Sequence, residues 1–232
     1  MRETKEDPDL DAVRERCRRQ LDRLDRALAD GELEEAEWYG LVNASLIDAY
    51  LATDDPYWQS GFRGDAARWE LHRRPVADAI GRDGDFLDIG CANGLLMESV
   101  VGWTAARGIT VEPYGLDLSE RMAALARSRC PQWAARIWVG NVMTWEPPRR
   151  FDIVRTGLEY VPPPRRAHLV ARLVERFLEP GGRLLVGTDN NEDVAADHVV
   201  RAAGFRVSGE ALGAADEKGR RVRLVWVDLP GA

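Results

Sequence analysis

The fold is decided by the stretch Phe86-Leu87-Asp88-Ile89-Gly90-Cys91-Ala92-Asn93-Gly94. An apolar segment with strand character runs directly into a turn of small residues, and a helical pattern follows over 95–106. Glycines at 90 and 94 let the backbone approach a ligand closely, and a helix that begins at such a turn presents unpaired N–H groups and its positive dipole end. This stretch therefore predicts a nucleotide-binding strand, turn and helix.

Short apolar runs alternate with helical patterns from Asp85 onward, which is typical of βαβ units and a parallel sheet. Helical periodicity dominates before that point. We predict a helical N-terminal cap or lid at 1–80 and a doubly wound α/β domain at 81–232. The expected strands are 86–89, 111–116, 136–139, 151–154 and 183–187, with a closing hairpin of 205–207 and 221–227 around a polar turn at 213–220. The expected helices of the domain include 95–106, 119–130 and 165–178.

Composition excludes several classes of function. The chain has 232 residues, 45% of them hydrophobic and 31% charged, as in ordinary globular proteins. A net charge of −7 argues against a dedicated nucleic-acid binder, because phosphate neutralisation needs a concentrated basic surface. Lys5 and Lys218 are the only lysines, and neither lies in an apolar element, which disfavours pyridoxal-phosphate enzymes and Walker-type nucleotidases.

Cysteine usage and hydropathy predict the compartment. Cys17, Cys91 and Cys130 are far apart and form no paired motif, so we expect free thiols in a reducing compartment. The N-terminus is charged, and no apolar run approaches the roughly 18 residues of a membrane span. The sequence therefore predicts a cytoplasmic protein without membrane or nucleic-acid partners, and a homodimer stays open.

Three further motifs follow in order along the chain. Asp117 ends the second expected strand, where a carboxylate can accept hydrogen bonds from both ribose hydroxyls. Asn141 and Val142 follow the third strand, where the amide can bind an adenine edge while Val142 packs on the ring. The stretch 178–186 stops a helix and leads into the fifth strand. A dinucleotide fingerprint would need further glycines, but Ala92 occupies one of those positions.

With these motifs in this order, residues 85–229 resemble the class I S-adenosylmethionine-dependent methyltransferases. The resemblance implies a Rossmann-like sheet of seven strands with an antiparallel last strand. It also implies S-adenosylmethionine as cofactor, with 90–94 around its methionine part and Asp88 orienting this loop or contacting the amino group. The cofactor-binding residues that it implies are Asp88, Gly90, Cys91, Ala92, Asn93, Gly94, Asp117, Leu118, Asn141, Val142 and Thr156.

Two positions depart from the family's pattern. The family often has Gly where Ala92 stands and Asp where Asn141 stands. Alanine adds only a methyl group, and asparagine keeps one acceptor oxygen for an adenine amino group. These departures would weaken cofactor binding rather than abolish it.

Two segments are candidates for the acceptor side of the site. From its place in the lid, Trp58, together with nearby aromatic residues, would shield the sulfonium and attract it by cation–π contact, and Arg73 would pair with the cofactor carboxylate. Aromatic packing between helix and sheet is the alternative role for Trp58. Methyl transfer depends mainly on alignment and water exclusion, so a base is optional. If the acceptor is a hydroxyl, Glu159 and Tyr160 after the fourth strand are the catalytic candidates.

We therefore expect an S-adenosylmethionine-dependent methyltransferase that acts on a small-molecule acceptor in specialised metabolism. Oxygen is the preferred acceptor atom, because no Asn-Pro-Pro-Tyr motif follows the fourth strand. No metal is expected, since Asp189-Asn190 is one residue out of register with the ligands of cation-dependent relatives and Thr156 stands where another carboxylate is needed. The alternatives are a cofactor-binding protein without methyl transfer, as a sensor, partner subunit or repurposed fold, and a nicotinamide-dependent reductase.

Overall fold

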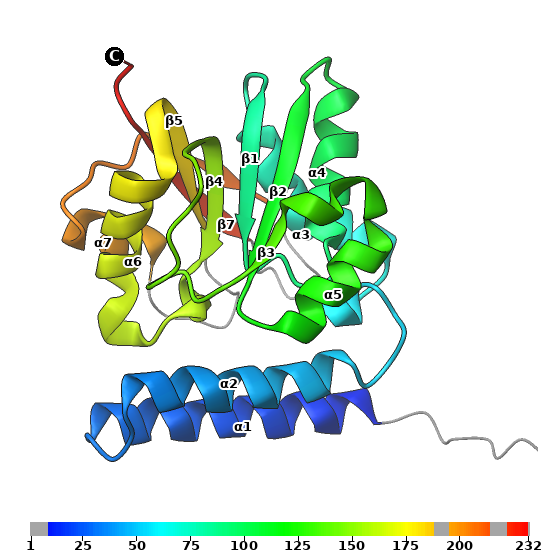
Figure 1. Cartoon of the computed structure of the whole chain (residues 1–232), viewed down its shortest axis with the longest axis vertical. Helices are drawn as coiled ribbons and strands as arrows, with labels where there is room; N and C mark the ends of the chain where they lie inside the picture. Colours follow the sequence, from blue (N-terminus) through cyan, green and yellow to red (C-terminus); the bar gives the residue numbers. More distant parts are fainter. Residues whose placement is uncertain (1–8, 188–194, 214–221, 232) are drawn as a thin grey trace, which may run out of the picture.

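Figure 1 shows the computed structural model, which describes residues 9–187, 195–213 and 222–231. These residues form one seven-stranded sheet in the order β3-β2-β1-β4-β5-β7-β6. Strands β1 to β5 pair in parallel, whereas β7 is antiparallel to both β5 and β6. The predicted doubly wound sheet with an antiparallel last strand is confirmed. The strands are β1 (Gly84–Ile89), β2 (Val111–Asp117), β3 (Ile137–Val139), β4 (Phe151–Gly157), β5 (Leu178–Gly187), β6 (Gly209–Leu212) and β7 (Arg223–Asp228).

Helices cover both faces of the sheet, and side chains cap several of their first turns. Asp65 accepts a hydrogen bond of 2.9 Å from the Arg68 N–H at the start of α3, and Ser119 accepts one of 3.3 Å from Met122 in α5. Helices α3, α4 and α5 lie on one face, while α6 and α7 lie on the other (Figure 1). The helices are α1 (Leu10–Ala29), α2 (Glu35–Tyr50), α3 (Ala66–Asp78), α4 (Leu95–Ala105), α5 (Glu120–Arg129), α6 (Arg166–Arg172) and α7 (Ala196–Ala202).

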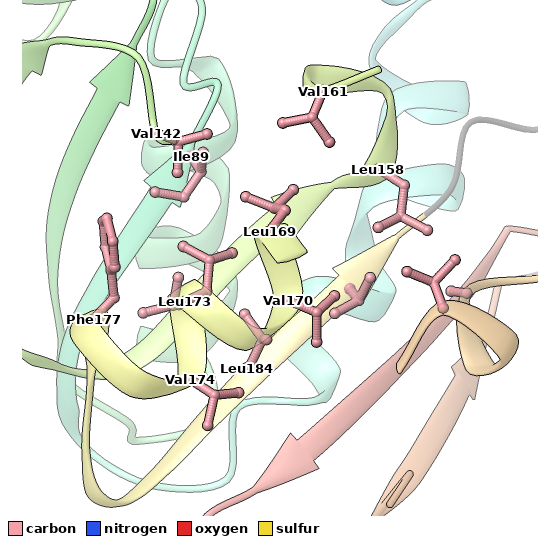
Figure 2. Packing of buried hydrophobic residues seen from close by; sticks show 14 of the residues in the cluster. Ile89, Val142, Leu158, Val161, Leu169, Val170, Leu173, Val174, Phe177 and Leu184 are labelled. Atoms are coloured by element: carbon pink, nitrogen blue, oxygen red, sulfur yellow. The ribbon is translucent and has the colours of Figure 1, made fainter. Parts of the chain in front are cut away.

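The larger part of the core lies between the sheet and α6. Figure 2 shows Leu169, Leu173 and Phe177, which gather with Ile89 of β1 and Leu184 of β5. Each of these side chains is at most 2% exposed, and full burial of such a residue stabilises the fold by about 1.5–3 kcal/mol. This apolar layer fixes the strands whose carboxyl ends carry the predicted site.

The closing hairpin differs from the prediction. Residues 205–207 are not a strand, because α7 is followed by Gly204 with a φ of 89° and the chain then packs against the core. The strand that pairs with β7 begins at Gly209, opposite Trp226. Of the polar turn predicted at 213–220, the described residues include only Gly213.

The helix predicted for 165–178 is also shorter than expected. After α6 the chain forms a π-helical turn, Leu173–Phe177, and β5 already begins at Leu178. The pairing of β5 with β4 shifts register between Phe151 and Ile153, which accommodates the Pro180-Gly181-Gly182 segment inside the strand. The predicted helix stop is thus part of the sheet.

Helices α1 and α2 form a pair that lies across the carboxyl ends of the strands (Figure 1). Ile47 of α2 packs with Ala92 and Met122 of the sheet domain. Exposed ion pairs stabilise this contact by only about 0–1 kcal/mol each. Apolar packing therefore contributes most of the free energy that holds the helix pair in place. These ion pairs are Asp11–Arg63 at 2.6 Å, Glu35–Arg165 at 2.6 Å and Asp48–Arg121 at 3.2 Å.

No helix within the described residues combines the length and apolar character needed to cross a bilayer. The domain boundary at residue 80, the cytoplasmic location and the homodimer stay predictions. Cys17, Cys91 and Cys130 are free thiols.

Candidate functional site

A cavity of about 1230 Å³ lies between the carboxyl ends of the strands and the α1/α2 pair. Gly90, Asp117 and Asn141, which follow or end β1, β2 and β3, line one part of it. Tyr39 and Tyr50 line it from α2. Open α/β sheets bind ligands at this edge, where the strand order reverses between neighbouring strands. The motifs singled out in the sequence therefore meet in one cavity.

The turn after β1 has an unusual backbone. Gly90, Ala92 and Gly94 all have positive φ, at 72°, 47° and 80°, and Ala92 is the only residue other than glycine with this conformation in the described chain. Left-handed backbone costs a residue with a Cβ about 1–2 kcal/mol. The Ala92 methyl group packs with Ile47 and Met122. The residue that departs from the family's glycine therefore also anchors α2.

Asp117 is held by backbone N–H groups. Its Oδ2 accepts a hydrogen bond of 2.8 Å from Ala92, and its Oδ1 accepts one of 2.8 Å from Ser119. Burial raises the pKa of Asp117 to about 6, although these two hydrogen bonds oppose the shift. An ionised carboxylate has about four lone-pair sites, so it can still accept from two ribose hydroxyls. The geometry fits the predicted role.

Asn141 and Val142 lie at the end of the cavity that the resemblance assigns to adenine. The Asn141 Oδ1 accepts a hydrogen bond of 2.9 Å from the Met143 N–H, and the carbonyl of Val142 accepts one of 2.9 Å from Arg172 Nε. Asn141 is thereby oriented by its own turn while its oxygen keeps a second lone pair. Leu118, which is 36% exposed, lines the same end.

Other predicted cofactor residues lie beside the cavity without lining it. The Asn93 amide donates to the Pro56 carbonyl at 2.7 Å, and its oxygen accepts from the Leu95 N–H at 3.2 Å, so it ties a lid loop to the start of α4. Cys91 packs with Met97 and Ala123 in a small cluster, and Thr156 donates to the carbonyl of Gly157. Gly94 packs near Cys130. Cofactor contact by these residues stays a prediction.

The aromatic residues of the lid segment have mainly packing roles. The indole N–H of Trp58 donates to the carbonyl of Ala49 at 2.7 Å, and Trp58 does not line the cavity. The alternative of aromatic packing therefore describes Trp58 better than sulfonium shielding. Phe62 and Arg73 do line the cavity, and the Arg73 guanidinium lies 5.8 Å above the Phe62 ring.

A buried polar network joins β1, β4 and the segment after β4. Arg155 pairs with Asp88 at 3.2 Å, directly opposite it on the neighbouring strand, and donates a hydrogen bond of 2.8 Å to the Tyr160 hydroxyl. The Tyr160 ring lies against Gly90, where an added Cβ would come within 2.5 Å of it. Burial raises the pKa values of Tyr160 and Asp88, and Arg155 opposes both shifts. The network places Tyr160 beside the cofactor loop.

Both predicted catalytic residues, Glu159 and Tyr160, line the cavity. The sequence reasoning missed Arg155, Tyr39 and Tyr50, which line it as well. Burial raises the pKa of Tyr50, and the nearby Tyr160, Glu159 and Asp117 add to this shift. Tyr50 thus lies near both the predicted catalytic residues and Asp117.

Two signals could have found the missed residues. Tyr39 and Tyr50 are 11 residues apart, which is about three helical turns, so they share one face of α2. Arg155 is a charge that directly follows the apolar run 151–154. Neither signal identifies a ligand without the tertiary structure.

Acidic, histidine and cysteine side chains form no group of three suited to a metal ion within the described residues. Asp189 and Asn190, which were weighed as metal ligands, lie outside those residues. The absence of a metal stays a prediction.

This arrangement of sheet, glycine turn and acidic strand end defines a nucleotide-binding α/β fold of the Rossmann type. Residues 86–182 match the family model described as a methyltransferase domain. This match, which covers less than half of the chain, confirms the resemblance to S-adenosylmethionine-dependent methyltransferases. No curated protein matches the chain in sequence.

Solved structures share the fold at low sequence identity. The 1,6-didemethyltoxoflavin-N1-methyltransferase of Burkholderia thailandensis, solved with its substrate and S-adenosylhomocysteine, is 17% identical with a TM-score of 0.62, covering 85% of this chain and 91% of that one. The N-methyltransferase NodS of Bradyrhizobium japonicum WM9 is 17% identical with a TM-score of 0.53, covering 76% and 98%. The 4+2 cyclase SpnF is 16% identical with a TM-score of 0.51, covering 69% and 81%.

Proposed function

We propose that the chain transfers the methyl group of S-adenosylmethionine to a hydroxyl oxygen of a small-molecule acceptor in specialised metabolism. The observation that carries the proposal is the position of Glu159 and Tyr160. Both line the cavity directly after β4, and the Tyr160 ring touches the cofactor loop at Gly90. A carboxylate that could accept a proton thus lines the same cavity as the cofactor loop.

The size of the cavity supports an enzyme with a second ligand. Pockets for one drug-sized ligand measure about 300–1,000 Å³. The cavity here is about 1230 Å³ and extends from Asn141 to Leu224. It therefore has room for a nucleoside cofactor and an acceptor together. The Burkholderia thailandensis neighbour, which was solved with both kinds of ligand, agrees with this interpretation.

Each group in the cavity would have a distinct role. Asp117 would hold the ribose, and the backbone of the turn at Gly90 would pass close to the methionine part. When bound, the cofactor supplies an electrophilic methyl group on a sulfonium. Glu159 would accept the proton of the acceptor hydroxyl as the oxygen attacks, and α2 would exclude water from the reacting atoms. Alignment in a dry cavity supplies most of the acceleration.

Turnover with model acceptors tests the proposal. The wild-type protein would be incubated with S-adenosylmethionine and a panel of phenols, amines and thiols, and S-adenosylhomocysteine formation would be measured. We expect methylation of phenols, with kcat reduced about 10²- to 10⁴-fold in Glu159→Gln, the usual contribution of a general base. Cofactor binding by calorimetry should persist in Glu159→Gln and be lost in Asp117→Ala. Preferential methylation of amines or thiols would contradict the oxygen assignment.

A second candidate function is cofactor binding without methyl transfer. The solved structure of the cyclase SpnF shares this fold, and its printed name describes a different reaction. The departures at Ala92 and Asn141 are the features of this chain that keep the candidate open. Tight binding of S-adenosylhomocysteine with no methyl transfer to any acceptor in the panel would favour it.

A further inference from the structure

Arg155 has an incomplete set of partners for a buried arginine. It is 6% exposed and lines the cavity. Its hydrogen bonds to described residues all use Nη1, which donates to Asp88 at 3.2 Å, to the Ile89 carbonyl at 3.5 Å and to the Tyr160 hydroxyl at 2.8 Å. The Nε atom is buried and has no partner among the described residues.

This pattern leaves one edge of the guanidinium for a ligand. Arginine is planar, and the Nε–H and one Nη2–H point in parallel along the edge opposite Nη1. A carboxylate matches two parallel donors and binds them bidentately. A buried donor that finds no partner is unfavourable, so a cavity that keeps one is expected to present it to a ligand.

We infer that the Nε–Nη2 edge of Arg155 binds a carboxylate group of a ligand in the cavity. The inference rests on the proposed function and deepens it. Asp88 and Tyr160 hold Nη1 and so fix the direction in which the opposite edge points. Arg155 lies opposite Asp88 on the neighbouring strand, and Asp88 comes two residues before Gly90. This register places Arg155 next to the cofactor loop.

Two ligands of the reaction could supply the carboxylate. One source is the amino-acid part of the cofactor, and the other is an acidic acceptor. The sequence assigned the cofactor carboxylate to Arg73, whose guanidinium lies over the rings of Phe62 and Trp69 at 5.8 and 5.5 Å. Arg155 instead lines the cavity near the turn after β1 at Gly90.

The first arm of the test varies the ligand on the wild-type protein. Calorimetry would compare S-adenosylhomocysteine with S-adenosyl-3-thiopropylamine, which is the same molecule without its carboxylate. If the cofactor is the source, decarboxylation weakens binding roughly 10- to 100-fold, the range for charge-assisted hydrogen bonds. Arg155→Lys, which keeps the charge and loses the edge, then weakens S-adenosylhomocysteine by a similar factor and leaves the decarboxylated ligand unchanged.

The second arm tests an acidic acceptor as the source. The protein saturated with S-adenosylhomocysteine would be titrated with 4-hydroxybenzoate and with 4-hydroxybenzyl alcohol as the uncharged match. If the acceptor supplies the carboxylate, the acid binds at least 10-fold more tightly than the alcohol, and Arg155→Lys removes this preference. Affinity for S-adenosylhomocysteine then stays the same in both proteins.

A matched control and a folding control accompany both arms. Arg183→Lys changes an arginine of the neighbouring strand β5 that pairs with Asp228 outside the cavity, and it should alter neither preference. If Arg155→Lys does not fold, the double variant Asp88→Asn with Arg155→Met is used in the same measurements instead. This double variant removes both charges of the buried ion pair.

Two results distinguish failure of this inference from failure of the proposed function. If wild type binds S-adenosylhomocysteine but neither carboxylate is preferred, Arg155 serves only its partners within the protein, and the inference is overturned while the proposed function stands. If wild type does not bind S-adenosylhomocysteine, the proposed function itself fails.

Discussion

The two halves of the cavity are built from different kinds of groups. The cofactor half uses backbone, because Gly90 offers a bare main chain and the Asp117 carboxylate is held by the N–H groups of Ala92 and Ser119. The acceptor half uses side chains such as Glu159 and Tyr39, which come from the segment after β4 and a helix of the lid. The cofactor half can be recognised from short sequence motifs because its groups are close together in the chain. The acceptor half is assembled only on folding, because its side chains are far apart in the sequence.

Substitution of Gly90 should break the cofactor half most severely. In Gly90→Ala the new Cβ would lie 2.5 Å from the Tyr160 ring, and the φ of 72° disfavours any residue with a Cβ. Strain and overpacking together should lower the free energy of unfolding by about 4 kcal/mol and abolish S-adenosylhomocysteine binding. Urea unfolding and calorimetry measure the two effects.

Gly102→Ala is the matched control for this substitution. Gly102 lies inside α4 with no atom within 4 Å of an added Cβ. Alanine should therefore raise the free energy of unfolding by about 0.5–1 kcal/mol. Equal stability of Gly90→Ala and wild type would show that the contact between Tyr160 and the turn is loose.

Asp117 gives the cofactor half a pH dependence with a defined sign. Its pKa is about 6 in the folded protein and near 3.9 in the unfolded chain, so between these values the folded state binds the extra proton. The free energy of unfolding therefore falls as pH rises from about 4 to 6, by up to about 3 kcal/mol. Binding of S-adenosylhomocysteine strengthens over the same interval, because the ionised carboxylate accepts the ribose hydroxyls.

Asp117→Asn isolates this effect. The variant should lose the difference in unfolding free energy between pH 4 and pH 7 that is specific to this side chain, and its weak cofactor binding should not vary with pH. Denaturant unfolding and calorimetry at several pH values provide the comparison. Identical pH profiles for the two proteins would contradict the assignment to Asp117.

The substitution Tyr39→Phe, with a smaller expected effect, tests the acceptor half of the cavity. Tyr39 is 7% exposed, and its hydroxyl has no hydrogen-bond partner among the described residues. Tyr39→Phe should therefore raise the free energy of unfolding by about 1 kcal/mol, or the melting temperature by about 2–4 °C. Tyr39 also lines the cavity, so acceptor binding should weaken in the same variant if its hydroxyl contacts the acceptor.

Tyr114→Phe serves as the control for Tyr39. The Tyr114 hydroxyl accepts a long hydrogen bond of 3.4 Å from Arg149, and Tyr114 does not line the cavity. Its removal should leave the melting temperature unchanged or slightly lower. A fall in melting temperature for Tyr39→Phe would mean that its hydroxyl has a structural role.

The sequence predicts the glycine turn and the position of Asp117 because their determinants are local, and Gly90 and Asp117 both line the cavity. Their contacts with the cofactor stay predictions. A strand that ends in Gly90, and an acid at the end of the next strand, specify both conformation and position from a few neighbouring residues. The fold follows from the alternation of strands and helices. Residues 205–207 are predicted as a strand because Phe205 and Val207 alternate with Arg206, and this pattern is equally satisfied by an irregular segment whose two apolar side chains pack on the core.

Long-range contacts explain what the sequence could not predict. Trp58 is directed by its hydrogen bond to the Ala49 carbonyl, which depends on how the lid loop meets α2. Arg155 breaks the apolar pattern of β4, yet its meaning comes from Asp88 on a strand 67 residues earlier. Motif spacing carries no information on such pairs.

The placement of the α1/α2 pair has a consequence for how such proteins diversify. Both helices precede β1 in the chain and contribute no strand to the sheet. They meet the sheet domain through apolar contacts, since Trp38, Tyr39 and Val42 of α2 belong to the buried cluster that contains Leu87 and Leu158, and through exposed ion pairs such as Glu35–Arg165 and Asp48–Arg121. The roof of the cavity is therefore one contiguous segment of the chain. Exchange or recombination of this one segment could supply a new acceptor surface while the chemistry beneath it is inherited unchanged.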